Sequence, residues 1–165
     1  NIGIPLKWSV TDVASAEWVK RNTDAEEIKV HNDSRDDEGL VLFVADHFKW
    51  ITYGGNDRLI DLLLEKLAKP KFKKRVNLYH STPKFPPQIE ELNLEVLEKY
   101  KSRPHVGVGY EGRCEDIFPD CAVVFKNVDF IEKFLGDDDA IGATLSPKKF
   151  YDFFVNMNQL EIANG

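Results

Sequence analysis

The sequence predicts an α/β fold: one three-layer domain over residues 1–165, in which a mixed, mostly parallel sheet is flanked by helices. Short apolar segments of strand length alternate along the chain with amphipathic segments of helix length, and this alternation favours a largely parallel sheet. A chain of 165 residues is long enough for one core and short for two. Hydrophobic residues make up 42% and charged residues 30% of it, which predicts a folded rather than a disordered chain.

The first elements follow from local patterns. Residues 9–22 carry apolar side chains at helical spacing, and Ser9 is the expected N-cap. A short strand is expected at Ile28–His31. The polar stretch over residues 32–39 then predicts an exposed turn.

The run Leu40–Ala45 is apolar at every position and is followed by Asp46. Continuous hydrophobicity is typical of a strand buried on both faces, so we expect this run to be the central strand. A second short strand is expected at Trp50–Tyr53. Residues 57–68 place leucine and isoleucine at helical spacing, and Pro70 closes that helix.

The second half of the chain repeats the alternation. We expect strands at Val76–Tyr79 and Ala122–Phe125 and helices at Gln88–Tyr100, Val128–Leu135 and Ser146–Asn156. Residues 102–120 are punctuated by glycine and are predicted to be irregular. Their GxGxxG-like stretch at 107–112 follows a proline rather than an evident strand, which favours a turn over a nucleotide-binding loop.

The charged residues of the sequence indicate which kinds of binding partner to expect. The net charge of −6 argues against nucleic acid, because proteins that bind the phosphate backbone use Lys and Arg to release counterions. The basic run Lys69–Arg75 is interpreted as solvated loop or helix-end charge. No run approaches the roughly 20 apolar residues that a membrane span requires.

The two cysteines, Cys114 and Cys121, predict a small disulfide loop in an oxidising compartment. Asn32 begins an Asn-Asp-Ser glycosylation sequon, and Asn1 stands where a start methionine would be expected, which suggests a processed or trimmed chain. Together these features favour a secretory or extracellular protein over a cytoplasmic one.

The candidate site residues follow from the rule that ligands bind beyond the carboxyl ends of parallel strands. It selects Asp46 and His47 after one expected strand, and His80 and Ser81 after another. A carboxylate there could hold a divalent metal, and a histidine could act as an acid, a base or a hydrogen-bond donor. The acidic turn Asp137, Asp138 and Asp139 concentrates three like charges, which a cation would stabilise.

The segment Leu40–Leu64, with its buried strand, Asp46, glycine turn and Leu-rich helix, resembles the metal-site region of the glycosyltransferase domain of collagen lysyl hydroxylases. Residues 122–156 follow the same family's later order of elements. The resemblance implies a glycosyltransferase-A fold that binds a nucleotide sugar with Mn²⁺ through Asp46 and Asp137–Asp139. Lys49 stands where that motif has its second carboxylate, so a non-catalytic relative is the form we expect.

Two alternatives stay open. Leu78–Thr82 resembles the nicotinamide adenine dinucleotide-binding strand of ADP-ribosyltransferases, which would place a nucleotide around His80. A protein-binding or assembly module with no active site is the other reading, because no complete catalytic motif is present and aromatic residues are numerous. Whether the chain is an enzyme is left open at this point.

Overall fold

The computed structural model describes residues 6–67, 75–137 and 144–165. The chain forms two compact units, Asn1–Leu78 and Tyr79–Gly165. The expectation that residues 1–165 make a single domain remains a prediction. Among the described residues, no helix combines the length and the apolar composition that crossing a bilayer requires.

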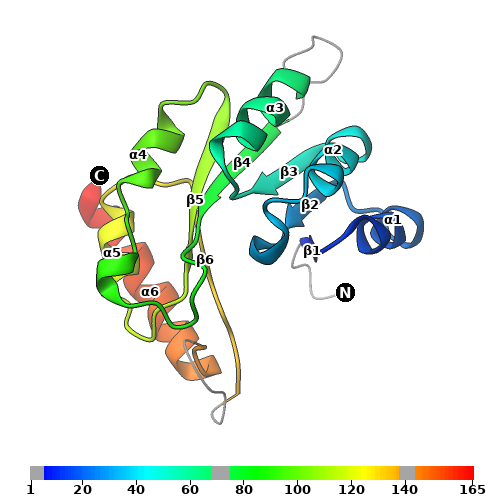
Figure 1. Ribbon diagram of the computed structural model, residues 1–165. Coiled ribbons are helices and arrows are strands. Elements are labelled where there is room, and N and C mark those ends of the chain that lie inside the picture. The colour runs from blue at the N-terminus through cyan, green and yellow to red at the C-terminus, as the bar shows by residue number, and fades with distance from the viewer. Residues whose placement is uncertain (1–5, 68–74, 138–143) are drawn as a thin grey trace. The chain divides into compact units, whose positions relative to one another are not determined.

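The first unit alternates strands with helices (Figure 1). Its elements are β1 (Trp8–Val10), α1 (Val13–Asn22), β2 (Glu27–Val30), the short 3-10 helix η1 (Asn32–Ser34), α2 (Glu38–His47), β3 (Trp50–Tyr53) and α3 (Asp57–Leu67), and β4 (Arg75–His80) continues into the second unit. The pairs β1–β2, β2–β3 and β3–β4 are all parallel and follow chain order. This is the arrangement that strand–helix alternation predicts.

The second unit continues the pattern with η2 (Ile89–Glu91), α4 (Val96–Lys101), β5 (Val106–Gly112), α5 (Phe118–Val124), β6 (Phe130–Lys133) and α6 (Pro147–Asn164). Strands β5 and β6 pair in parallel, with Gly109 opposite Phe130 and Gly112 opposite Lys133. A β-carbon at Gly109 would come within 2.2 Å of the Phe130 ring, so the glycine provides the space in which that ring packs. The α/β class is confirmed, and the described pairings are parallel rather than mixed.

Several predicted elements are confirmed. Trp50–Tyr53 is β3, residues 57–67 of the predicted helix form α3, and the strand predicted at Val76–Tyr79 lies within β4. Helix α3 buries Leu59, Ile60 and Leu63 completely, at the spacing that indicated an amphipathic helix. The first helix begins later than expected, because Ser9 belongs to β1 and the N-cap is Asp12, whose side chain accepts a hydrogen bond from the Ser15 amide.

The predicted central strand Leu40–Ala45 is wrong: these residues form the middle of helix α2. Leu40, Val41, Val44 and Ala45 are buried, which is the spacing of one helical face. The N-terminal signal is Asp37, whose carboxylate accepts a hydrogen bond from the Leu40 amide at 3.0 Å. A short apolar run does not distinguish strand from helix, and this cap is the feature that decides.

Two further predictions in the second unit are wrong, because a predicted strand is mostly helix and a predicted helix contains a strand. The strand expected at Ala122–Phe125 lies mostly in helix α5, which has Pro119 in its first turn. The helix expected at Val128–Leu135 contains strand β6 instead. The glycine-rich stretch 107–112 is not a turn but most of strand β5, in which glycine leaves room for neighbouring side chains. The last predicted helix is confirmed and extends to Asn164 as α6.

Candidate functional site

The structure places Asp46 in the last turn of helix α2 rather than at the end of a strand. Its carboxylate forms an exposed ion pair with Lys66, at 2.9 Å. The adjacent His47 contacts the same helix, with Nδ1 2.8 Å from the Phe43 carbonyl oxygen and its ring stacked on the Phe43 ring. The expected position of both residues beyond a buried strand is therefore wrong.

The acidic turn is described only in part. Asp137 is exposed, and Asp138 and Asp139 lie outside the described residues, as does most of the basic run Lys69–Arg75. Within the described ranges no three or more His, Cys, Asp or Glu side chains come together in a group that could hold a metal ion. A metal role for this turn remains a prediction.

His80 and Ser81 lie where the sequence predicted, at the carboxyl end of β4 and directly after it. They make different contacts. The Nε2 atom of His80 is 2.6 Å from the Leu92 carbonyl oxygen, and its ring packs near Tyr110. The hydroxyl of Ser81 donates to Glu111 Oε1 at 3.0 Å, and both residues are buried.

Buried charged and polar side chains lie near the carboxyl ends of β4, β5 and β6 in the second unit, in two groups that we together call the carboxyl-end cluster. Ser81, Glu111 and Arg113 form one group. Lys133 and Asp120, which belongs to the first turn of α5, form the other group on the opposite face of the sheet, because Gly112, which faces Asp120, alternates with Glu111 and Arg113 along β5. Carboxyl ends of parallel strands meet at one edge of a sheet and are the usual place for ligands in α/β proteins. The cluster therefore lies where a binding site is expected.

Arg113 is the cationic centre of one half of the cluster. Its Nε donates to Glu111 Oε1 at 2.5 Å, and its Nη1 donates to the Pro83 carbonyl oxygen at 3.3 Å. The side chains of Arg113 and Glu111 are only 7% and 4% exposed. A guanidinium has five N–H donors, and these two contacts use two of them. Nη2 has no partner within the described part of the chain and is not sealed from solvent.

The other half of the cluster is a fully buried ion pair. Lys133 Nζ donates to Asp120 Oδ2 at 2.7 Å and to the Cys114 carbonyl oxygen at 2.9 Å, and both charged side chains are 0% exposed. The second Asp120 oxygen faces Gly112, where a β-carbon would lie 2.0 Å from it. Burial raises the pKa of Asp120, and the ammonium of Lys133 opposes that rise.

Aromatic rings border the Arg113 side of the cluster. The guanidinium lies 5.8 Å from the centroid of the Phe134 ring, which makes an edge contact with Phe85 at 5.1 Å. Rings around a cation exclude water and strengthen its interactions. Burial also raises the pKa of the nearby Tyr79, and the charge of Glu111 adds to this rise, so Tyr79 keeps its proton at neutral pH.

The predicted disulfide is wrong, because Cys114 and Cys121 are both free thiols. Cys114 is buried beside the cluster, and its backbone carbonyl oxygen accepts a hydrogen bond from Lys133 Nζ. Burial raises the pKa of both thiols, which keeps them protonated and poorly nucleophilic.

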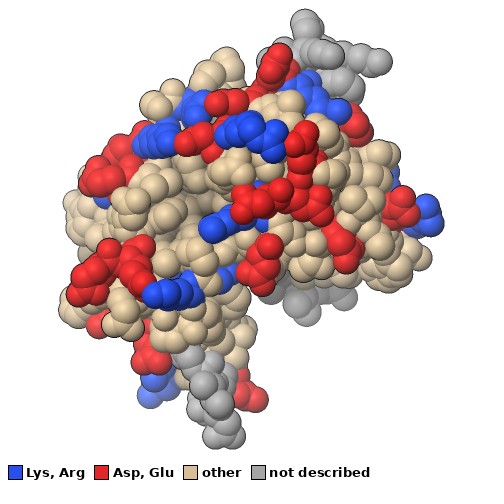
Figure 2. Space-filling model, viewed as in Figure 1, with Lys and Arg blue, Asp and Glu red and all other residues tan. Residues whose placement is uncertain are grey.

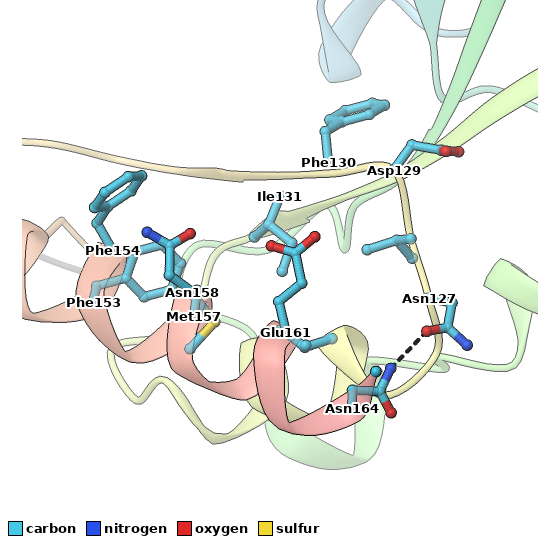
Figure 3. A pocket seen from close by; sticks show the side chains of 13 residues that line it. Asn127, Asp129, Phe130, Ile131, Phe153, Phe154, Met157, Asn158, Glu161 and Asn164 are labelled. Carbon is cyan, nitrogen blue, oxygen red and sulfur yellow. Dashed lines mark hydrogen bonds between the residues drawn. The ribbon is translucent and has the colours of Figure 1, made fainter.

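A cavity of about 650 Å³ lies elsewhere in this unit, between β6 and α6 (Figure 3). Ile131 and Met157 point into it, and a hydrogen bond of 2.6 Å between Asn164 and Asn127 closes one end. Asp129 and Phe130, at the amino end of β6, border the cavity, whereas the cluster lies at the carboxyl end of the same strand. The cavity is therefore separate from the buried charges.

The surface charges do not form a basic face in the view of Figure 2, where acidic and basic side chains lie beside one another. Exposed ion pairs of the described chain include Lys49 with Glu26 and Arg58 with Glu38, each at 2.8 Å. The charged side chains that are grouped and buried lie inside the second unit and not on that face.

Comparison with known proteins decides the family. A sequence profile described as the NeuB family matches residues 52–165, which is more than half of the chain. The chain belongs to the NeuB family. A sequence search of curated proteins gave no match.

Two solved structures are similar to this NeuB-family chain. N-acetylneuraminic acid (sialic acid) synthetase from Leptospira borgpetersenii serovar Hardjo-bovis, in complex with citrate, has a TM-score of 0.78 and 18% identity, over 95% of this chain and 57% of that one. A protein assigned as spore coat polysaccharide biosynthesis protein E from Chromobacterium violaceum has a TM-score of 0.79 and 16% identity, over 99% of this chain and 51% of that one. This chain thus spans little more than half the length of either.

Family membership overturns the glycosyltransferase-A resemblance and, with it, the nucleotide-sugar reading based on Asp46. The resemblance depended on a strand over Leu40–Ala45, and that segment is a helix. It also placed the metal-motif aspartate, Asp46, in the first unit, whereas the buried charges lie in the second. The matched region includes every residue of the carboxyl-end cluster.

Sequence reasoning found Ser81 and missed Glu111, Arg113, Asp120 and Lys133. A usable signal was present in Val106–Gly112, where Val106, Val108 and Tyr110 alternate with glycine and glutamate at the period of a strand. Reading that stretch as β5 would have placed Arg113 directly beyond a strand end. Nothing local identified Asp120, because its partner Lys133 is 13 residues away and was assigned to a helix.

Proposed function

We propose that this chain is a sugar-synthase domain of the sialic acid synthase type, which takes part in an aldol-type condensation. The observation that carries the proposal is the guanidinium of Arg113, buried beyond the end of β5 with donors to spare. Membership of the NeuB family and likeness in fold to a sialic acid synthetase support the reaction class.

The architecture proposed for the chain is part of a β/α barrel, in which parallel strands alternate with helices. Barrels of this type carry their active sites at the carboxyl ends of the strands. The carboxyl-end cluster occupies those ends for β4, β5 and β6. This agreement between fold type and position of charge favours the cluster over the cavity beside α6.

The substrates proposed are phosphoenolpyruvate and a sugar or sugar phosphate, the classes associated with this family. An aldol-type condensation joins a nucleophilic carbon to a carbonyl carbon, so the enzyme must hold an anionic reactant in a fixed orientation. Arg113 is suited to this because a guanidinium binds carboxylate and phosphate oxygens through two parallel hydrogen bonds. Glu111 positions Arg113, and Ser81 in turn positions Glu111.

Calorimetric titration of the full chain with phosphoenolpyruvate tests the proposal. We expect saturable binding that weakens by about tenfold or more in the double variant Arg113→Gln with Glu111→Gln, because a hydrogen bond to a charged group contributes about 1.5–3 kcal/mol. Changing both residues avoids leaving one buried charge without its partner. Lys149→Gln is the matched control, since Lys149 is an exposed cation on α6 of the same unit.

Two outcomes would contradict the proposal. One is the absence of binding at millimolar phosphoenolpyruvate by the folded wild-type chain. The other is equal affinity in the double variant and in the Lys149→Gln control. Turnover is not required, because the chain spans about half the length of the synthases that it resembles.

A further inference from the structure

Synthases of the NeuB family use a divalent metal, Mn²⁺, and the residues of the carboxyl-end cluster do not fit one. A divalent ion in a protein needs several oxygen, nitrogen or sulfur ligands that are neutral or negative. The described parts of the chain bring together no group of three or more His, Cys, Asp and Glu side chains. The two buried acids of the cluster, Glu111 and Asp120, already have protein cations as partners.

The contacts of the two acids leave too few oxygens together to hold a divalent metal. Glu111 Oε1 accepts hydrogen bonds from both Ser81 and Arg113. Asp120 Oδ2 accepts from Lys133, and Oδ1 is buried beside Gly112 without a hydrogen-bond partner in the described residues, so it is a single oxygen where a divalent ion needs several ligands. A divalent ion beside either acid would also meet a guanidinium or an ammonium at close range, and like charges repel strongly where water is excluded.

The same contacts leave a positive group available to an anion. Arg113 is oriented by Glu111 and by the Pro83 carbonyl and is bordered by Phe134, while its Nη2 remains without a protein partner in the described residues. A fixed guanidinium in a largely dry setting binds carboxylate or phosphate oxygens without the reorganisation that a flexible side chain would require. The side chain of Lys133 is fully buried and bound to Asp120 and to the Cys114 carbonyl, so it is not available to that ligand.

We propose that the carboxyl-end cluster of this chain binds its oxyanion ligand without a divalent metal, and that Arg113 supplies the positive charge. This inference rests on the proposed function, because it concerns the same site and the same ligand class. The ligand group is a carboxylate or a phosphate, and the geometry of Arg113 accepts both. Binding without a metal would differ from the metal dependence of the family, and a binding measurement is enough to detect the difference.

The test is calorimetric titration of the full chain in two buffers, one with EDTA and one with millimolar Mn²⁺. Pyruvate, inorganic phosphate and phosphoenolpyruvate are titrated separately, so that binding through the carboxylate, the phosphate or both is distinguished. We expect affinities that agree within about twofold between the buffers, and no binding of Mn²⁺ that depends on Glu111 or Asp120. Arg113→Lys keeps the charge but loses the planar fork, and we expect it to bind about tenfold more weakly.

The outcomes separate the two proposals. Tightening of about tenfold or more in Mn²⁺, or binding of Mn²⁺ that Glu111→Gln abolishes, would overturn metal independence and leave the proposed function intact. Binding of none of the three anions in either buffer would overturn both. The comparison of buffers uses the wild-type chain, so it decides the question even where a variant fails to fold.

Discussion

The two compact units hold their charges in opposite places. In the first unit, the ion pair of Lys66 with Asp46 lies at the surface, with side chains 30% and 54% exposed. In the second unit, Lys133 and Asp120 are completely buried. Exposed pairs contribute about 0–1 kcal/mol to stability, whereas removing one partner of a buried pair costs about 3–5 kcal/mol. An acidic residue that is conspicuous in the sequence can therefore matter less than one that is hidden.

The largest expected effect comes from breaking the buried pair. Lys133→Met should lower the free energy of unfolding by about 3–5 kcal/mol at pH 7, because it leaves the Asp120 carboxylate buried without a counter-ion. Urea denaturation followed by far-UV circular dichroism measures this, since all three tryptophans lie in the first unit and would not report on the second. Lys66→Met is the matched control, with an expected loss of no more than about 1 kcal/mol. Equal losses in the two variants would remove the contrast between the units.

The pH dependence of the same variant sharpens the comparison. Burial raises the pKa of Asp120 and Lys133 opposes the rise, so this pKa should rise further in Lys133→Met. A carboxyl group with a raised folded-state pKa contributes stability below its unfolded pKa of about 3.9, and that stability is lost as the pH rises through the folded pKa. The loss caused by Lys133→Met should therefore be smaller at pH 5 than at pH 7.

Denaturation curves across this pH range measure that difference. The double variant Lys133→Met with Asp120→Asn lacks the titrating carboxyl group, so its loss should not become smaller at pH 5. A loss in Lys133→Met that does not change with pH would mean that Asp120 is not the group that responds.

A smaller effect is expected from filling the space beside Asp120. Gly112→Ala would place a β-carbon 2.0 Å from Asp120 Oδ1, and we expect it to lower the free energy of unfolding by about 1–3 kcal/mol through overpacking. Gly39→Ala is the control in the first unit, because Gly39 is an exposed position of α2 and its β-carbon would meet only the Asp37 carboxylate, at 3.3 Å. We expect that variant to unfold at an unchanged or higher urea concentration, since alanine favours a helix. A similar loss in both variants would point to backbone effects instead of crowding.

The smallest change in stability is expected at Asp46, the residue that sequence analysis selected first as a metal ligand. Asp46→Ala should change the free energy of unfolding by no more than about 1 kcal/mol, because its ion pair with Lys66 is exposed. The thermal midpoint in Mn²⁺ should shift equally in the variant and in the wild-type chain. A stabilisation by Mn²⁺ that the substitution abolishes would restore Asp46 as a metal ligand and contradict the contrast drawn between the units.

Much of the fold could be predicted because it depends on local patterns. The spacing of Leu59, Ile60 and Leu63 indicated α3, and Pro147 indicated the start of α6. The errors fall where a short apolar run is compatible with two structures. Leu40–Ala45 has the composition of a buried strand, and only the cap at Asp37 and its packing on one helical face make it a helix.

The candidate site was less accessible to prediction than the fold. Ser81 followed from the rule about strand ends, but its partner Glu111 lies 30 residues later in a stretch that was read as a turn. Asp120 ends a stretch that was predicted to be irregular and belongs to helix α5, and Lys133 was predicted to be in a helix and belongs to strand β6. A buried ion pair cannot be recognised from hydrophobic spacing, because each charged partner looks in the local sequence like an ordinary surface residue.

Composition and hydrophobic spacing were enough to establish the class of this protein, an α/β chain in which strands and helices alternate. Hydrophobic spacing is a local property, because it depends on residues that are only a few positions apart in the sequence. The identity of the buried charges was decided only in three dimensions. Glu111 is close to Arg113 in the sequence, but burial of Lys133 is tolerable only because Asp120 reaches it from 13 residues away, and Glu111 meets Ser81 from 30 residues away. Those two contacts do not exist until the elements that carry them have come together.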